Sequence, residues 1–303
     1  MLDSDAMKPI SAAALVLLAV LSASAAEPVP ERFNRPAAER FAPRTATRYA
    51  ASSGTGAAAV VLAVWPGVLQ TASEREDCRL LRLGLLGSSN NNVSGLDLNL
   101  LYGCAHGAES AVQLGAVNVV HGPLSGAQLG LLNVSGLLAR GPVSTGFQIG
   151  LLGNYSDSFR GAQAGFLLNR VQTGAGAQVA AICNFTDRFR GVQLACVNLE
   201  ADEFRGVQLG VANAGAGDFA GLQLGLVNAG GERFHGLQVA AANTVGALDG
   251  GLQFGLFNYA REGNGWQIGV YNDAKSLRGV QIGLVNVLHS ADLPFLPFVR
   301  VAL

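Results

Sequence analysis

Cysteine and histidine have the greatest capacity for chemistry in this chain, because thiolates and imidazoles bind metal ions and thiols form disulfides. The sequence holds four of each, and the cysteines are Cys78, Cys104, Cys183 and Cys196. No two cysteines have C-x-x-C spacing, and the histidines are scattered along the chain. We therefore expect no zinc site.

An even number of cysteines is compatible with disulfides in an exported protein. We predict a bond between Cys78 and Cys104, in the least regular part of the sequence, where a cross-link of about 3 kcal/mol would help most. The two differ in repeat phase, so the bond requires a departure from regular coiling. Cys183 and Cys196 fall inside regular repeats and are expected to pack as small apolar side chains, with Cys196 in place of a core leucine.

The remaining residues show no pattern of catalysis. The sequence contains no P-loop, H-E-x-x-H, G-x-S-x-G or EF-hand motif. We interpret Asp97 as surface variation, and His121 and His235 as exposed side chains in turns. The sequence therefore predicts no catalytic, cofactor-binding or metal-binding residues, no cofactor and no enzymatic activity.

A repeated motif, Gly-x-Gln-x-Gly-x-x-Asn, dominates the chain, as in GLQLGLVN at 221–228. Every step from Gln148 to Gln253 is 15 residues, the last two steps are 14, and one earlier step is 20. Two degenerate copies centred on Arg82 and Asp97 come first, which makes about fourteen units. The motif glutamines are Gln113, Gln128, Gln148, Gln163, Gln178, Gln193, Gln208, Gln223, Gln238, Gln253, Gln267 and Gln281.

Alternating polar and apolar residues predict a β-strand around each glutamine. In the unit of Gln223, the apolar residues are Leu222, Leu224 and Leu226. We expect the apolar residues to be buried and the glutamine to point outward for solubility; sugar binding by an outward amide face is the less favoured alternative. The glycine two residues before the glutamine is expected at positive φ. A phenylalanine four residues before it, as at Phe219, is expected to form a buried stack.

Two all-β architectures are compatible with a 15-residue period. A β-solenoid of about fourteen coils with end caps stacks one unit per coil. A transmembrane antiparallel β-barrel is the alternative, since a strand of about 9–11 residues plus a turn has a similar length. The uniform turns and the lack of an aromatic girdle in the units favour the solenoid.

The domain boundaries follow from changes in composition along the chain. A basic start at Met7 and Lys8, an apolar run and small residues at 23–26 predict a signal peptide over 1–26. Residues 27–55 are rich in Pro, Arg, Ala and Ser and are interpreted as a flexible linker. We expect an N-terminal cap over 56–78, the repeat domain over 79–290 and a C-terminal cap over 291–303.

Composition limits the class of partner. Only 14% of the 303 residues are charged and the formal net charge is −1, which gives no reason to expect nucleic acid as a partner. The ligand, or the partner protein at the surface, stays unknown, and association with an outer membrane is an open alternative.

The repeat also resembles a bacterial surface-repeat family built from tandem GLQLGLVN-like units. The likeness covers about residues 60–303 and includes VWPG at 64–67, GLDLNLLYG at 95–103 and LPFLPFVRVAL at the end. This chain departs from the pattern where GAQVAAICN and GVQLACVN carry Ala in place of the second Gly. The resemblance implies an exported protein at the cell surface, outer membrane or periplasm with a structural or adhesive role. An outer-membrane barrel or pore is the functional alternative.

Overall fold

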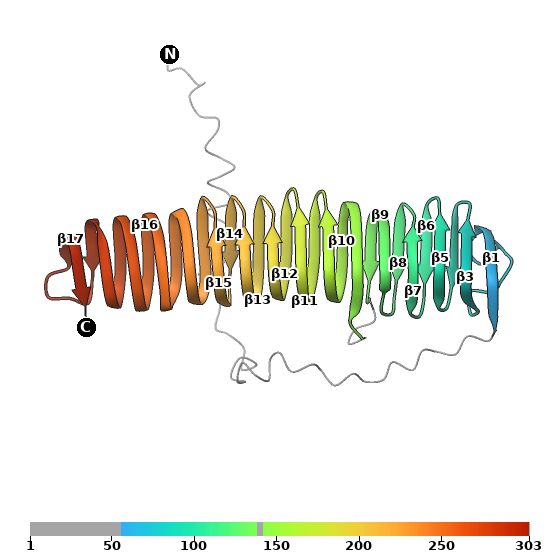
Figure 1. Ribbon diagram of the computed structural model, residues 1–303, viewed down its shortest axis with the longest axis horizontal. Coiled ribbons are helices and arrows are strands. Elements are labelled where there is room, and N and C mark those ends of the chain that lie inside the picture. The colour runs from blue at the N-terminus through green and yellow to red at the C-terminus, as the bar shows by residue number, and fades with distance from the viewer. Residues whose placement is uncertain (1–55, 138–141, 303) are drawn as a thin grey trace, which may run out of the picture.

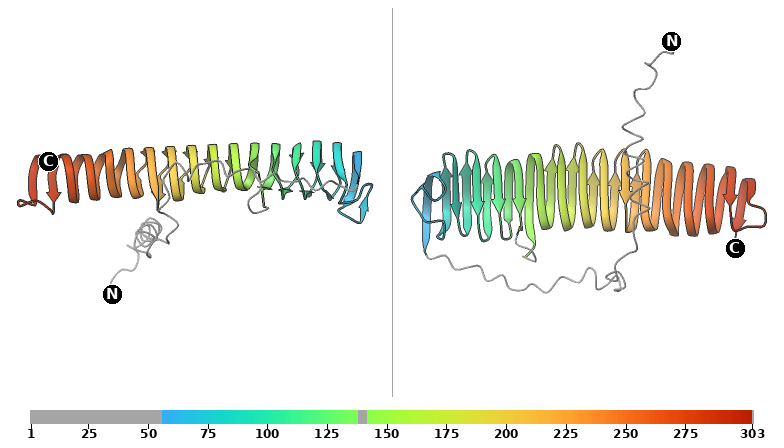
Figure 2. Two further views of the ribbon diagram at one scale, coloured as in Figure 1. Left: turned by 90° about the horizontal axis from the view of Figure 1, so that it is seen from below. Right: turned by 180° about the vertical axis from the view of Figure 1, so that it is seen from behind.

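The computed structural model describes residues 56–137 and 142–302, which form an elongated rod of stacked β-coils (Figures 1 and 2). The coils follow one another along the rod from β1 at one end to β17 at the other (Figure 1). Within these two ranges the regular elements are all strands. They are β1 (Ala57–Trp65), β2 (Leu69–Gln70), β3 (Asp77–Gly84), β4 (Gly87–Asn90), β5 (Val93–Asn99), β6 (Tyr102–Ala105), β7 (Glu109–Leu114), β8 (Val117–Val120), β9 (Ser125–Ser135), β10 (Ser144–Gly165), β11 (Leu168–Ala180), β12 (Cys183–Leu194), β13 (Val197–Leu209), β14 (Ala212–Gly215), β15 (Asp218–Leu224), β16 (Val227–Leu288) and β17 (Phe295–Ala302).

Successive coils pair in parallel, with equivalent repeat positions side by side. In the pairing of β13 with β15, Gln208 lies opposite Gln223 and Phe204 opposite Phe219. The same relation holds from β3 to the start of β16. The predicted solenoid is therefore confirmed. The antiparallel barrel is wrong for this part of the chain, because a period of one unit per coil brings identical positions together.

The predicted assignment of the strand faces is wrong. Gln223 is fully buried, whereas Leu222 and Leu224 are partly exposed and Leu226 is 61% exposed. All twelve motif glutamines are buried in the same way, so they cannot form an outward amide face for solubility or for sugar binding. The strands therefore turn the motif glutamines inward and the flanking apolar residues outward.

Hydrogen bonding between coils explains why the amides lie inside. Each glutamine from Gln128 onward donates from Nε2 to the Oε1 atom of the glutamine in the preceding coil, over 2.6 to 2.9 Å. Burial of a polar group is tolerated when the group is hydrogen-bonded, and this column satisfies each amide with the next. The unpaired atoms are at its two ends, Gln113 Nε2 and Gln281 Oε1. We call these twelve residues the glutamine column.

A second column is formed by the motif asparagines. Asn213 donates from Nδ2 to Asn228 Oδ1 at 2.9 Å and to the Leu224 carbonyl at 2.9 Å. The asparagines donate toward the C-terminal end of the rod, and the glutamines donate toward the N-terminal end. The amide dipoles of the two columns are therefore opposed, which limits the net dipole of the interior. The asparagine column consists of Asn118, Asn133, Asn154, Asn169, Asn184, Asn198, Asn213, Asn228, Asn243, Asn258, Asn272 and Asn286.

Aromatic stacking and glycine geometry complete the interior. Phe189, Phe204, Phe219 and Phe234 are buried, with successive ring centroids 5.1 to 6.0 Å apart, which confirms the predicted stack. Gly221 has the predicted positive φ, 141°. A Cβ atom there would overlap the backbone carbonyl of the glycine in the preceding coil, so glycine is required at Gly221.

Different pairings end the parallel stack. At the first coil, β1 pairs in parallel with β3 and antiparallel with the short β2. At the last coil, β17 runs antiparallel to the end of β16, with Val299 opposite Ile282. The predicted signal peptide at 1–26 and linker at 27–55 lie outside the described residues. In the described ranges no helix has the length and apolar character to cross a membrane.

Candidate functional site

The most extensive surface feature is a row of exposed apolar side chains along one edge of the rod. Each coil contributes to two parallel ladders, which we call its two sheets: one contains the glutamine position, as in β3, β5 and β7, and the other contains the asparagine position, as in β4, β6 and β8. The exposed apolar residues occupy the third position after the glutamine, between these two sheets. Cys196 shares this position and is exposed, so its predicted place in the core is wrong. We call this row the apolar corner; its large members are Leu85, Leu100, Leu131, Leu151, Phe166, Val211, Leu226, Leu256, Val270 and Leu284, each between 42% and 63% exposed.

Apolar side chains continue from this corner onto both sheets. On one sheet they flank the glutamine, as with Phe254 at 51% and Trp266 at 52% exposed. On the other sheet they precede the asparagine, as with Phe257 at 57% exposed. The apolar surface therefore wraps around the corner and covers part of each sheet.

The opposite edge of the rod carries the charged residues of the repeats. Its turns hold ion pairs between neighbouring coils, such as Arg233 with Asp218 at 2.5 Å. Arg261 and Glu262 are each about 60% exposed at this edge. We call this row of turns the charged edge. The rod is thus amphipathic around its circumference, with apolar and charged side chains segregated to opposite edges.

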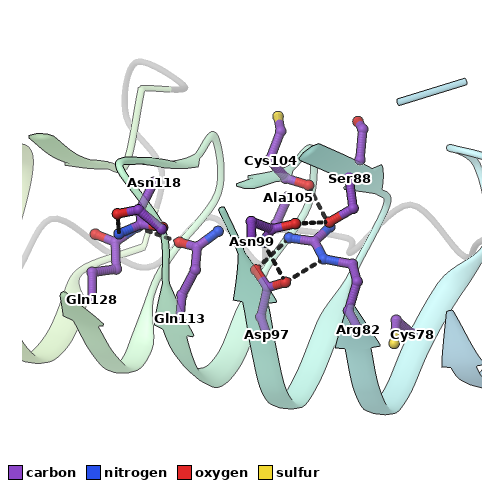
Figure 3. A network of polar contacts seen from close by, with 12 residues as sticks. Cys78, Arg82, Ser88, Asp97, Asn99, Cys104, Ala105, Gln113, Asn118 and Gln128 are labelled. Atoms are coloured by element: carbon purple, nitrogen blue, oxygen red, sulfur yellow. Dashed lines mark hydrogen bonds and ion pairs between the residues drawn. The ribbon is translucent and has the colours of Figure 1, made fainter. Parts of the chain in front are cut away.

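A buried ion pair occupies the glutamine position in the first two degenerate units (Figure 3). Arg82 lies opposite Asp97 in the parallel register, and both are fully buried. Arg82 donates to both carboxylate oxygens of Asp97, from Nε at 2.7 Å and from Nη2 at 2.6 Å, and its Nη1 donates to the Cys104 carbonyl. Burial lowers the pKa of Arg82, but the Asp97 carboxylate outweighs it and leaves that pKa raised. Asp97 is therefore a structural counter-ion, and its interpretation as surface variation is wrong.

Neighbouring polar groups complete the hydrogen bonding around the Asp97 carboxylate. Asn99 donates from Nδ2 to Asp97 Oδ1 at 2.7 Å, and Ser88 donates to Asn99 Oδ1. Gly103 stands at the asparagine position of this coil, and a Cβ there would collide with the Asn99 amide. In this coil, the Asn99 side chain therefore fills the space that the motif asparagine fills in the regular coils. Ser88, Arg82, Asp97 and Asn99 form what we call the ionic cluster.

A buried acid lies beside this cluster. Glu109 takes the position of the phenylalanine stack in the next coil, is fully buried, and has no hydrogen-bond partner on either carboxylate oxygen. Burial, together with the nearby Asp97 charge, raises the pKa of Glu109 well above its usual range, although Arg82 opposes this. Burial without a hydrogen-bond partner therefore favours the protonated form of Glu109.

The predicted disulfide between Cys78 and Cys104 is wrong, because all four cysteines are free thiols. Figure 3 shows the two sulfur atoms pointing in opposite directions, with the ionic cluster between them. The regular coiling persists into these units, so the departure that the bond required does not occur. Burial raises the pKa of both thiols.

The structure brings together three side chains that look scattered in the sequence. Cys104 and His106 lie two residues apart at β6, and His121 stands beside His106 in the next coil. The imidazole rings stack with centroids 5.3 Å apart, and Cys104 Sγ lies 3.6 Å from His121 Nδ1. We call this group the thiol–imidazole cluster. The 15-residue spacing of His106 and His121, one repeat length, is the sequence signal that could have revealed it.

Comparison of the chain with protein-family models, curated proteins and solved structures found no match.

Proposed function

We propose that this protein is a non-catalytic, exported repeat protein that serves as an adhesive rod, and that its apolar corner attaches it to the lipid surface of a membrane. The observation that carries the proposal is the segregation of exposed apolar side chains to one edge and charged side chains to the other.

Loss of apolar surface from water is the main force for such attachment. Large exposed apolar patches on a protein mark sites of interaction with proteins or membranes. Leu226 and Leu284, each 61% exposed, belong to a row that runs along nearly the whole repeat region. The repeat keeps this position apolar in coil after coil, although the interior does not require it.

The shape of the apolar surface favours lipid over a flat protein partner. A second sheet docked on one face would leave the corner and the other face in water. Fluid acyl chains, in contrast, can surround an edge and both of its flanks. The charged edge, with residues such as Arg261 and Glu262, would then remain on the aqueous side. Apolar contact drives this binding, which agrees with a formal net charge of −1.

The expected signal peptide at 1–26 supports a location outside the cytoplasm, at the cell surface, outer membrane or periplasm. The resemblance to surface-repeat proteins points in the same direction. The long rod with its repeated surface supports a structural or adhesive role, since equivalent contacts recur in each coil.

Vesicle flotation tests the proposal. The full chain is mixed with phosphatidylcholine vesicles, and we expect it to float with the lipid and to do so equally well at high salt. The double variant Leu226→Ser/Leu256→Ser should lose much of this binding. The matched control, Glu232→Ser/Arg261→Ser, changes two residues of the charged edge and should bind like the unmodified protein.

Two results would overturn the lipid assignment. One is a soluble, monomeric rod that stays with the aqueous fraction. The other is a discrete dimer, found by analytical ultracentrifugation, that the Leu226→Ser/Leu256→Ser variant dissociates; this would identify a second copy as the occupant of the apolar surface.

A further inference from the structure

We propose that Cys104, His106 and His121 form a binding site for a zinc-class divalent ion. The sulfur and one ring nitrogen from each imidazole lie within 4.8 Å of one another. This is the one group of three or more metal-ligating side chains so close together in ranges 56–137 and 142–302.

Strand geometry explains how the three ligands converge. Residues two apart on a strand point to the same side, so Cys104 and His106 share one face of the β6 segment. The parallel register places Ala105 opposite Val120, which brings His121 alongside His106. Two neighbouring coils therefore contribute ligands, and the ion would bridge them.

The spacing suits tetrahedral coordination. With Zn–S near 2.3 Å and Zn–N near 2.05 Å, two ligand atoms at a tetrahedral angle are separated by about 3.6 Å. Cys104 Sγ and His121 Nδ1 are 3.6 Å apart. Thiolate and imidazole are the ligands that zinc prefers in proteins, and three protein ligands leave a fourth position for water.

The surroundings hold the ligands in place. Ser89 Oγ lies 2.9 Å from His106 Nε2, and Gln70 donates from Nε2 to the Ser89 carbonyl at 2.7 Å. Cys104 is 1% exposed, His121 is partly buried and His106 is exposed, so the site opens to solvent on the imidazole side. Hydrogen bonds of this kind to ligands and their neighbours commonly orient metal sites.

Metal binding at this site would stabilise the N-terminal part of the rod. The site lies across the junction between the two interiors, because Cys104 and His106 follow Asp97 of the ionic cluster and His121 follows Gln113, the first residue of the glutamine column. An ion that bridges β6 and the residue after β8 would cross-link these coils. Binding requires the thiolate, so the ion displaces the Cys104 proton, and affinity should increase with pH.

Cobalt titration of the reduced full chain tests the proposal. We expect one equivalent of Co²⁺ to produce a thiolate-to-cobalt charge-transfer band and the visible bands of tetrahedral cobalt. Zn²⁺ should displace the cobalt and raise the melting temperature. The variant Cys104→Ser should lose the charge-transfer band, and His121→Gln should weaken binding by more than the roughly 10-fold to 100-fold typical of a lost outer partner.

Matched controls separate the site from general thiol or imidazole binding. Cys196→Ser and His235→Gln remove exposed residues far along the rod and should leave the titration unchanged. Cys104→Ser should fold, because the equivalent position of the preceding coil is already a serine, Ser89. Absence of the charge-transfer band in the unmodified protein, or its survival in Cys104→Ser, would overturn the proposal.

Discussion

The coils up to Cys104 and the coils from Gln113 onward fill the same interior position by different means. In the longer region, each neutral amide donates to one neighbour and accepts from the other. In the N-terminal region, Arg82 and Asp97 satisfy each other, and Asn99 and Ser88 complete the cluster.

The difference shows which interior can be repeated. An amide has a donor and an acceptor, so a column of amides can be extended by one coil after another. In an ion pair, the guanidinium only donates and the carboxylate only accepts, so the two groups pair across two coils and the same pattern does not repeat in the next coil. Gln113 Nε2 is the buried donor at the junction and has no hydrogen-bond partner. The ionic cluster therefore ends the column, and the following coils propagate it.

The largest loss of stability is expected when the buried ion pair between Arg82 and Asp97 is broken. Asp97→Ala leaves the Arg82 charge buried without a counter-ion and should destabilise the rod by about 3–5 kcal/mol. The double variant Arg82→Gln/Asp97→Gln extends the glutamine column and should be near neutral or stabilising. Chemical denaturation measures both. A double variant as unstable as Asp97→Ala would show that the two interiors are not interchangeable.

Substitution within the glutamine column should cause a smaller but still severe loss of stability. Gln223→Ser leaves a donor and an acceptor of its two neighbours unpaired, at about 1–3 kcal/mol for each buried group. Leu224→Asp, at a partly exposed position, should be milder. This order is the reverse of the one that an apolar interior would give, and thermal unfolding of the two variants distinguishes them.

Glycine geometry gives a third test. Gly221→Ala places a methyl group against the Gly206 carbonyl at a φ that L-residues rarely adopt, and a loss of about 2 kcal/mol or more is expected. Gly225→Ala is the control, because other coils already carry Ala180 and Ala195 at that position. Equal melting temperatures for the two variants would contradict the role of positive φ.

The smallest effect concerns a buried acid within the regular region. Burial, with smaller contributions from Asp202 and Asp218, raises the pKa of Glu200 to about 8, against an ordinary value of 4.5. Below pH 4.5 the group is protonated in both the folded and the unfolded states. Stability should fall as the pH rises from 4.5 to 8, because the unfolded chain loses its proton first.

Glu200→Gln should remove this dependence and stabilise the protein at pH 9 by about 1–2 kcal/mol, since relaxation lets water reach a carboxylate near the charged edge. At pH 4 the variant and the unmodified protein should melt together. A constant difference for Glu200→Gln across the range would refute the pKa shift.

Much of the fold follows from the sequence, because the period is a one-dimensional property. A uniform spacing of 15 residues predicts equal coils, a recurring glycine predicts positive φ, and a recurring phenylalanine predicts a stack. The two N-terminal sites, the ionic cluster and the thiol–imidazole cluster, are harder to predict from the sequence. Arg82 and Asp97 look like unrelated substitutions until the register places them opposite each other, and His106 and His121 look scattered until one repeat length separates them.

The sequence by itself determined the period and the strand alternation, and it favoured the parallel stacking of units over an antiparallel barrel. Only the tertiary structure decided which face of each strand is buried, because period-2 alternation is the same whichever side turns inward. Which face is buried depends on the contacts between neighbouring coils. Amides stacked in register hydrogen-bond to one another along the rod, so burial of Gln223 leaves no polar group unsatisfied, and the adjacent leucines remain outside.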